Sequence, residues 1–455
     1  QQAERDFDDP GRFVPLPGFE WSAVPSEGGH HNVYFRRHNQ PIRRNSHKGL
    51  KDQSDVDTDL PHILDVYRAY RGQDVVITPH VGGSHADLTH HEPTLEPALE
   101  ITSDHGTFEW FLEESLRHGY RMGFVGGSDS HDGRPGADTP GWQERRYAQG
   151  GLTGLYAPEL TLEAVHEALR ARRCYATTGA RMVLQLDADG HMMGADHRTS
   201  SRPTISLSVA GTAPLERVEL FRGLERIYSH PVGTGVNSKR VRVLWEGASR
   251  KTSYSGVIWD GHLQVSGATI ASVERLRFDS PRSRVLDRMA TALRWYSVTC
   301  GYRSGVVLDL ADAADDAELQ LVVSTSLISR PYFGGHGDED PGRMSYAPAE
   351  SVTFSCSLRE LGGGQKEMYL TTPSLPKHPD SDDADPAPQF GQLSRKIVVS
   401  LAPAPGGPEA AEFTFTDPAP RPGINPYWAR IVQTDMEMAW TSPVFVDYVA
   451  APRPD

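Results

Sequence analysis

Asp129 and His131 stand two residues apart, directly after the short apolar run Met122–Val125. The apolar run predicts a buried strand, which Gly126 and Gly127 end. In extended backbone, side chains two residues apart share a face. A carboxylate and an imidazole on one face are ligands that a divalent metal accepts. The alternative is a polar turn, in which Asp129 caps a helix and His131 lies in solvent.

Three earlier segments repeat this layout of a short apolar run followed by a potential ligand. They are Arg12–Pro17 before Glu20, Asp74–Thr78 before His80, and Ala98–Ile101 before His105. Helical patterns separate most of these runs, and alternating strands and helices predict parallel strands. The carboxyl ends of parallel strands open on one side of a sheet, so we expect these side chains to converge at one mouth.

Five motifs together resemble a known superfamily. They are GFEW at Glu20, TPHVGG at His80, EITSDHG at His105, GSDSHDGRPG at Asp129 and RRCYATTGARM, which ends at Met182. The combination resembles the PHP (polymerase and histidinol phosphatase) superfamily of metal-dependent hydrolases, and within it the DUF3604 branch, which carries a similar β-rich tail.

The resemblance implies a fold, a cofactor and a ligand set. The fold is α/β, a distorted (β/α)7 TIM-like barrel with two or three divalent ions (Zn²⁺, Mn²⁺ or Fe²⁺) at the carboxyl ends of its strands. The implied metal ligands are Glu20, His80, His105, Asp129 and His131.

Arg134 and Glu100 are less settled by the sequence. A guanidinium fork suits an oxyanion of a substrate, so Arg134 is a candidate catalytic residue beside Asp129 and His131. The alternative for Arg134 is a salt bridge to a loop aspartate. Glu100 lies in the alternating run ALEI, where it can face either the mouth or the core.

Other histidines of this region compete for the same role. His30 and His31 are adjacent on an extended chain and point to opposite faces, so at most one of them can face a site. A cluster of His85, His90, His91 and Glu92 lies in a loop without regular spacing, and the resemblance does not assign these residues to the metal.

One feature departs from the family pattern. Proteins of the superfamily begin with an H-x-H pair, and no such pair precedes Glu20. We therefore expect a further segment of about one to two hundred residues before Gln1, from the same gene product or as an associated fragment.

Composition narrows the range of partners. The 455 residues carry a net charge of -14, which disfavours a nucleic-acid partner because phosphate contacts need a basic face. A basic run, Arg36–Lys51, can guide a small anionic substrate or be a solvated loop. No apolar run approaches the roughly 18 residues of a membrane span. Three scattered cysteines favour a reducing, cytoplasmic compartment, and a periplasmic location is the alternative. The sequence leaves the oligomeric state open.

The pattern of the chain changes after Met182. We predict a barrel portion over residues 1–182 and an antiparallel β-sandwich over 183–455, because short alternating runs follow one another there. These runs are Thr204–Val209, Arg240–Leu244, Leu319–Val323, Ser351–Cys356, Lys396–Leu401 and Glu412–Thr416. Helices are predicted at Pro61–Tyr70, Phe108–Arg117, Leu162–Ala171 and Ser283–Leu293.

A cluster of His, Asp and Glu around two or three cations predicts metal-assisted hydrolysis. The resemblance favours a phosphate ester as the substrate. The alternatives are amide or ester hydrolysis, because a metal site does not dictate the electrophile, and a degenerate barrel that only binds.

Overall fold

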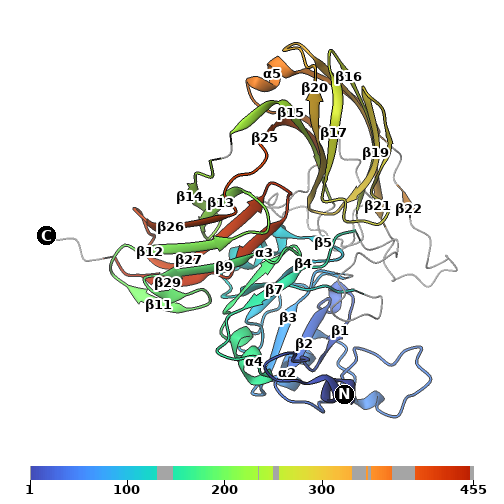
Figure 1. Cartoon of the computed structure of the whole chain (residues 1–455). Helices are drawn as coiled ribbons and strands as arrows, with labels where there is room; N and C mark the ends of the chain where they lie inside the picture. The colour runs from blue at the N-terminus through green and yellow to red at the C-terminus, as the bar shows by residue number, and fades with distance from the viewer. Residues whose placement is uncertain are drawn as a thin grey trace.

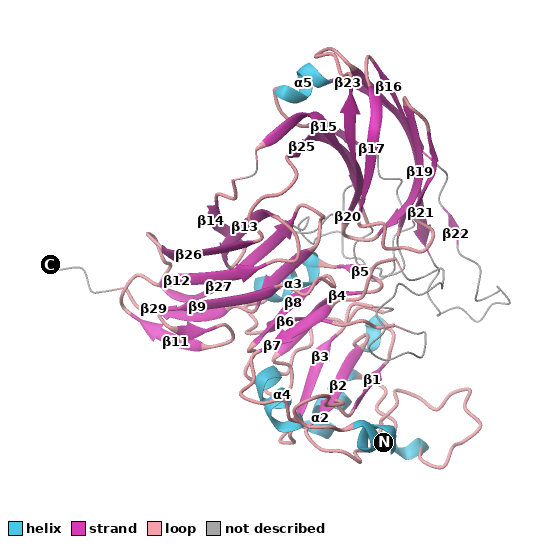
Figure 2. Ribbon diagram, viewed as in Figure 1, coloured by secondary structure: helices cyan, strands magenta, loops and turns pink. Residues whose placement is uncertain are grey.

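The computed structural model describes residues 2–82, 84–130, 147–233, 235–248, 256–329, 345–346, 350–370 and 395–450. His131 and Arg134 lie outside the described residues. Strands dominate the described chain, and Figures 1 and 2 show them in three parts. The amino-terminal part lies at the bottom of the view, a middle pair of sheets at the left and a distal pair at the top.

The amino-terminal part begins with an antiparallel sheet in the order β1-β2-β3. Its strands are β1 (Gly18–Trp21), β2 (His31–Phe35) and β3 (Val75–Pro79). A short connection joins β1 to β2, so the two strands form a hairpin in which Trp21 pairs with His31. The helices α1 (Gln2–Phe7) and α2 (Ile63–Tyr70) accompany this sheet.

A second small sheet has the order β5-β4-β6. Its strands are β4 (Ala98–Ser103), β5 (Gly106–Thr107) and β6 (Gly123–Gly126), and α3 (Glu109–Arg117) connects β5 to β6. Here β4 and β6 are parallel, as a helical crossover permits. All six residues of β4 are buried.

The predicted (β/α)7 barrel is wrong for the described residues. They form several sheets, most of them antiparallel, and no closed barrel. The first strand is also not Arg12–Pro17 but Gly18–Trp21, which contains Glu20 itself. Pro15 and Pro17 lack the backbone N–H that a strand ladder requires, which explains this shift.

Three of the four predicted helices are confirmed, namely α2, α3 and α4 (Leu162–Arg170). Thr161 caps α4 by accepting a hydrogen bond from the backbone N–H of Ala164 at 3.2 Å. The predicted helix Ser283–Leu293 is wrong, because this segment contains β18 (Arg284–Arg288) and the start of β19 (Ala292–Thr299). Pairing with neighbouring strands and burial of Leu293 and Trp295 override the local helical pattern.

The middle pair consists of a four-stranded and an eight-stranded sheet. The four-stranded sheet contains β9 (Val183–Ala188), β10 (His191–Met192), β12 (Thr204–Ala210) and β26 (Ala410–Thr416). The eight-stranded sheet contains β7 (Leu152–Leu155), β8 (Cys174–Thr177), β11 (Asp196–Thr199), β13 (Leu215–Arg222), β14 (Glu225–His230), β27 (Gly423–Gln433), β28 (Met438–Thr441) and β29 (Val444–Tyr448). Because β8 pairs with β28, one sheet spans both sides of residue 182.

The distal pair is antiparallel and encloses its own core, with Trp245 and Trp295 stacked at 4.9 Å. One sheet contains β15 (Val236–Glu246), β17 (Thr269–Leu276), β20 (Arg303–Ala311), β24 (Lys366–Tyr369) and β25 (Lys396–Pro403). The other contains β16 (Val257–Ser266), β18, β19, β21 (Glu318–Ser329), β22 (Ser345–Tyr346) and β23 (Glu350–Ser357), and α5 (Leu358–Gly362) follows it. The six alternating runs predicted after Met182 all lie in observed strands.

One hydrophobic core joins all three parts. Phe111 and Phe124 of the amino-terminal part pack in the same cluster as Trp428 of the middle pair and Tyr302 of the distal pair. This shared core fixes the parts relative to one another. Among the described residues, no helix is long and apolar enough to cross a membrane.

Candidate metal centre

The antiparallel sheet β1-β2-β3 brings three potential ligands together at one end of its strands. Glu20 lies at the carboxyl end of β1, His30 directly before β2, and His80 directly after β3. Trp21 pairs with His31, and His31 pairs with Pro79, so the three ligand positions are neighbours across the sheet.

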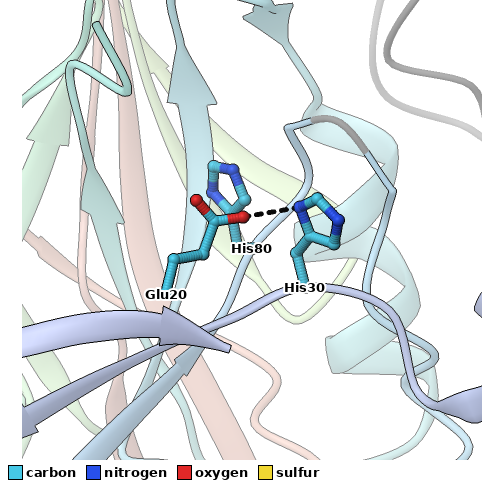
Figure 3. A group of neighbouring side chains, drawn as sticks. All are labelled: Glu20, His30 and His80. Carbon is cyan, nitrogen blue, oxygen red and sulfur yellow. Dashed lines mark ion pairs between the residues drawn. The ribbon is translucent and has the colours of Figure 1, made fainter. Parts of the chain in front are cut away.

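Glu20, His30 and His80 form the first ligand group. One oxygen or nitrogen atom from each residue lies within 4.8 Å of those of the other two. The Nδ1 atom of His30 is 2.6 Å from Oε1 of Glu20, and the two imidazole rings stack at 6.2 Å. Figure 3 shows the carboxylate and both rings turned toward one another.

Asp104, His105 and Asp129 form the second ligand group, on the loops that follow β4 and β6. The Oδ2 atom of Asp129 is 2.9 Å from Nε2 of His105 and 3.3 Å from Nε2 of His80. Asp129 therefore joins the two groups. Its φ of +50° is rare outside glycine, and such strained backbone concentrates at functional sites.

The side chain of Glu100, which the sequence allowed to face either the mouth or the core, faces the candidate site. Its Oε1 atom is 2.7 Å from Nδ1 of His80, and its Oε2 atom is 3.4 Å from the side-chain amide of Asn32. A hydrogen bond from Nδ1 of His80 to Glu100 leaves Nε2 of His80 to act as a ligand. This is how a carboxylate commonly orients a metal-binding histidine.

Burial and charge act against each other in the centre. Burial raises the pKa of Asp129, but His80 and His105 outweigh it and hold that pKa well below its usual range. Burial lowers the pKa of His80, and the charges of Glu100 and Asp129 reverse this and raise it. For Glu100, burial dominates and the pKa is raised. The centre therefore stabilises positive charge.

Two glycines leave space where the ligand atoms meet. A Cβ atom at Gly82 would collide with Nε2 of His80, Oδ2 of Asp129 and the ring of His105. A Cβ atom at Gly127 would collide with the Glu100 carboxylate. Any side chain at position 82 would therefore fill the point on which both groups converge.

These residues fit divalent ions. The site contains four carboxylates, from Glu20, Glu100, Asp104 and Asp129, and three imidazoles. Among the described residues, the charged groups that most shift the pKa values of Glu20, Glu100 and Asp129 are histidines or members of this same set. With neutral imidazoles, two divalent cations would balance the four carboxylates.

Comparison with known proteins gives one family. A model described as "Protein of unknown function (DUF3604)" matches residues 1–102 and 139–211. The chain matches DUF3604 over these two stretches. The DUF3604 stretches include Glu20, His30, His80 and Glu100, whereas Asp104, His105 and Asp129 lie between them.

Similar proteins occur in Chlamydia. An uncharacterized protein of Chlamydia pneumoniae is 28% identical over 260 residues, which is 50% of this chain and 40% of the relative. Uncharacterized proteins of Chlamydia trachomatis serovar D and Chlamydia muridarum are each 24% identical over similar lengths. The chain thus spans about 40% of the length of these relatives.

The structure brings four of the predicted ligands together, namely Glu20, His80, His105 and Asp129. Sequence reasoning did not include His30 and Asp104 among the ligands. The alternation of adjacent side chains did limit the choice to one of His30 and His31, and Asp104 directly precedes His105 in the EITSDHG motif.

The other polar clusters serve different roles. His31 lies 3.4 Å from the buried Glu96, on the face opposite His30, and His91 contacts the same carboxylate at 2.8 Å.

The basic run begins at Arg36, directly after β2 and at the end of that strand opposite His31. At the usual rise per strand residue, Arg36 is about 16 Å from His31. Arg36 there pairs with Asp74 at 3.0 Å. The start of the basic run therefore does not lie at the candidate centre.

Proposed function

We propose that the chain is a metal-dependent hydrolase of the PHP type that holds two divalent ions and cleaves phosphate esters. The observation that supports this most is the contact between the two ligand groups, in which His80 lies 3.3 Å from Asp129. Two adjacent groups of nitrogen and oxygen ligands are the arrangement of two-metal phosphoesterase sites. The resemblance of the GFEW, TPHVGG and GSDSHDGRPG motifs supports the phosphate ester as substrate.

The residues of the chain have separate tasks in this proposal. Glu20, His30 and His80 hold one ion, and Asp104, His105 and Asp129 hold the other. Ions bound there would activate water and neutralise charge on a phosphoryl oxygen. Glu100 keeps the ring of His80 in orientation by accepting from Nδ1. Gly82 leaves the space in which a substrate oxygen can approach both groups.

Metal analysis tests the first half of the proposal. The chain is stripped of metal, titrated with Mn²⁺ or Zn²⁺ and analysed for bound ions. We expect two ions per chain, and one fewer in the His30→Ala or His105→Ala variant. A wild-type chain that takes up no ion contradicts the proposal.

Hydrolysis assays test the second half. We expect the metal-loaded chain to cleave p-nitrophenyl phosphate or bis(p-nitrophenyl) phosphate, and Asp129→Asn to lose this activity by at least about a hundredfold. Cleavage of p-nitrophenyl acetate alone would instead identify an esterase. A chain that binds two ions but cleaves none of the three is a binding protein.

A further inference from the structure

A turn of the distal pair reaches the second ligand group. Residues 300–302 connect β19 to β20, and the carbonyl of Cys300 accepts a hydrogen bond from the backbone N–H of Thr107 at 3.0 Å. Thr107 is two residues beyond His105. The backbones approach so closely that a Cβ atom at Gly106 would collide with Cys300, and one at Gly301 with the carbonyl of Thr107. The turn therefore fixes the segment that follows His105.

Tyr302 extends this contact to Asp104. Its buried hydroxyl reaches the backbone carbonyls of Tyr147 and Val298, the latter at 2.9 Å. The backbone N–H groups of Tyr147 and Ala148 both donate to the carbonyl of Asp104 at 2.9 Å. The Tyr302 hydroxyl therefore fixes the segment 147–149, which in turn fixes the Asp104 backbone.

Asp104 and the residues that follow the segment 147–149 are also linked to the loop that carries Asp129. The backbone N–H of Asp104 donates to the carbonyl of Ser128 at 3.1 Å, next to Asp129. The N–H of Gly151 also donates to the carbonyl of Gly127 at 2.8 Å. A displacement of residues 147–151 would thus move both loops of the second ligand group.

Buried charges keep Tyr302 itself in place. The guanidinium of Arg277 lies over its ring at 4.7 Å, and Arg277 donates to Asp279 at 2.9 Å through Nε. Asp279 in turn accepts from the backbone N–H of Gln149 at 3.3 Å. The distal pair therefore contacts the segment 147–149 twice, through Tyr302 at Tyr147 and through Asp279 at Gln149.

We propose that Tyr302 is a positioning residue for the Asp104–His105–Asp129 group, and that it acts selectively on the ion held there. This inference rests on the proposed two-ion function. Among the described residues, the hydrogen bonds of the 300–302 turn reach Thr107 and Tyr147 beside the second group, whereas Glu20, His30 and His80 are positioned by β1, β2 and β3. Groups that hydrogen-bond a metal ligand directly typically change metal affinity by about 10- to 100-fold, and Tyr302 acts one residue further away, so we expect the lower end of this range.

Double variants test the selectivity. In the His30→Ala background only the ion of the second group remains, and we expect Tyr302→Phe to weaken its binding about tenfold in a Zn²⁺ titration. In the His105→Ala background only the first ion remains, and we expect Tyr302→Phe to leave its affinity unchanged. A purely structural role would weaken both ions or neither, and either result overturns the proposal.

A matched control separates positioning from loss of a buried hydroxyl. Tyr427→Phe also removes a buried hydroxyl, one that donates to Asp417 at 2.7 Å in the middle pair. We expect both single variants to lower the melting temperature similarly, and only Tyr302→Phe to lower ion affinity. Equal ion affinity in the two variants contradicts the inference.

Two further outcomes remain distinguishable. If the wild-type chain takes up no ion, the proposed function fails and this inference falls with it. If wild type binds two ions and Tyr302→Phe binds them equally well, only the positioning role fails. Asp279→Asn, which weakens the acceptor for Gln149, serves if Tyr302→Phe does not fold, and the same selective loss is expected.

Discussion

His30 and His31 are adjacent and face opposite sides of β2. His30 contacts Glu20 in the candidate centre, while His31 contacts the buried Glu96. We expect His30→Ala to remove one bound ion with little change in the free energy of unfolding. We expect His31→Ala to retain both ions and to cost about 3 kcal/mol, because it leaves a buried carboxylate short of a partner. Metal titration and chemical denaturation of the two variants measure this, and equal behaviour would show that the faces are misassigned.

Gly82 tests whether the space between the ligand groups is needed. Gly82→Ala places a methyl group against His80, Asp129 and His105. We expect it to lower ion binding by at least tenfold, because the ligand atoms can no longer converge. The control is Gly233→Ala, in a loop where a Cβ atom meets nothing within 4 Å. Zn²⁺ titration compares the two, and an unchanged affinity in Gly82→Ala would place the ions elsewhere.

At the scale of elements, the turn between β19 and β20 carries the contact between the distal pair and the loop after His105. Gly301 and Gly119 share a φ of +73°, but only Gly301 faces another backbone, at Thr107. Alanine at either position costs about 1 kcal/mol of backbone strain. We expect Gly301→Ala to cost at least about 1 kcal/mol more than Gly119→Ala in chemical denaturation. Equal costs would mean that the turn yields without loss.

At the scale of the whole molecule, Glu437 lies where the middle pair of sheets meets the distal pair. Its carboxylate accepts from Thr178 after β8 and lies 3.5 Å from Arg277 of the distal pair. Burial raises the pKa of Glu437 to about 7 from 4.5, although Arg277 acts in the opposite direction. The junction therefore contains a carboxyl group that titrates near neutral pH.

This raised pKa predicts a pH dependence of stability. A folded-state pKa above the unfolded one contributes stability that is complete below pH 4.5 and is lost as pH rises through about 7. The loss is on the order of 3 kcal/mol for a shift of this size. We expect Glu437→Gln to lack this part of the decline when unfolding is measured between pH 5 and 8. Parallel curves for wild type and variant would contradict the prediction.

The sequence by itself determined the local features of this protein. Helical periodicity with the Thr161 cap located α4, and period-two alternation located strands such as β12 and β25, because both patterns depend on residues near in the chain. The same alternation at His30 and His31 restricted the site to one of the two. The residue types at Glu20, His80, His105 and Asp129 predicted metal ligands before any contact between them was known.

Only the tertiary structure decided how these elements are arranged. The sequence pattern favoured parallel strands, and the family resemblance implied a barrel, but β1, β2 and β3 are antiparallel. Strand direction depends on pairing between segments far apart in the chain. Glu100 could face the core or the mouth until its contact with His80 fixed it. The link from Tyr302 to Asp104 joins residues almost two hundred positions apart, and both acceptors in it, the carbonyls of Tyr147 and Asp104, belong to the backbone. Contacts of this kind leave no pattern in the chain, because a backbone carbonyl is present at every residue and only the fold decides which one a distant side chain reaches.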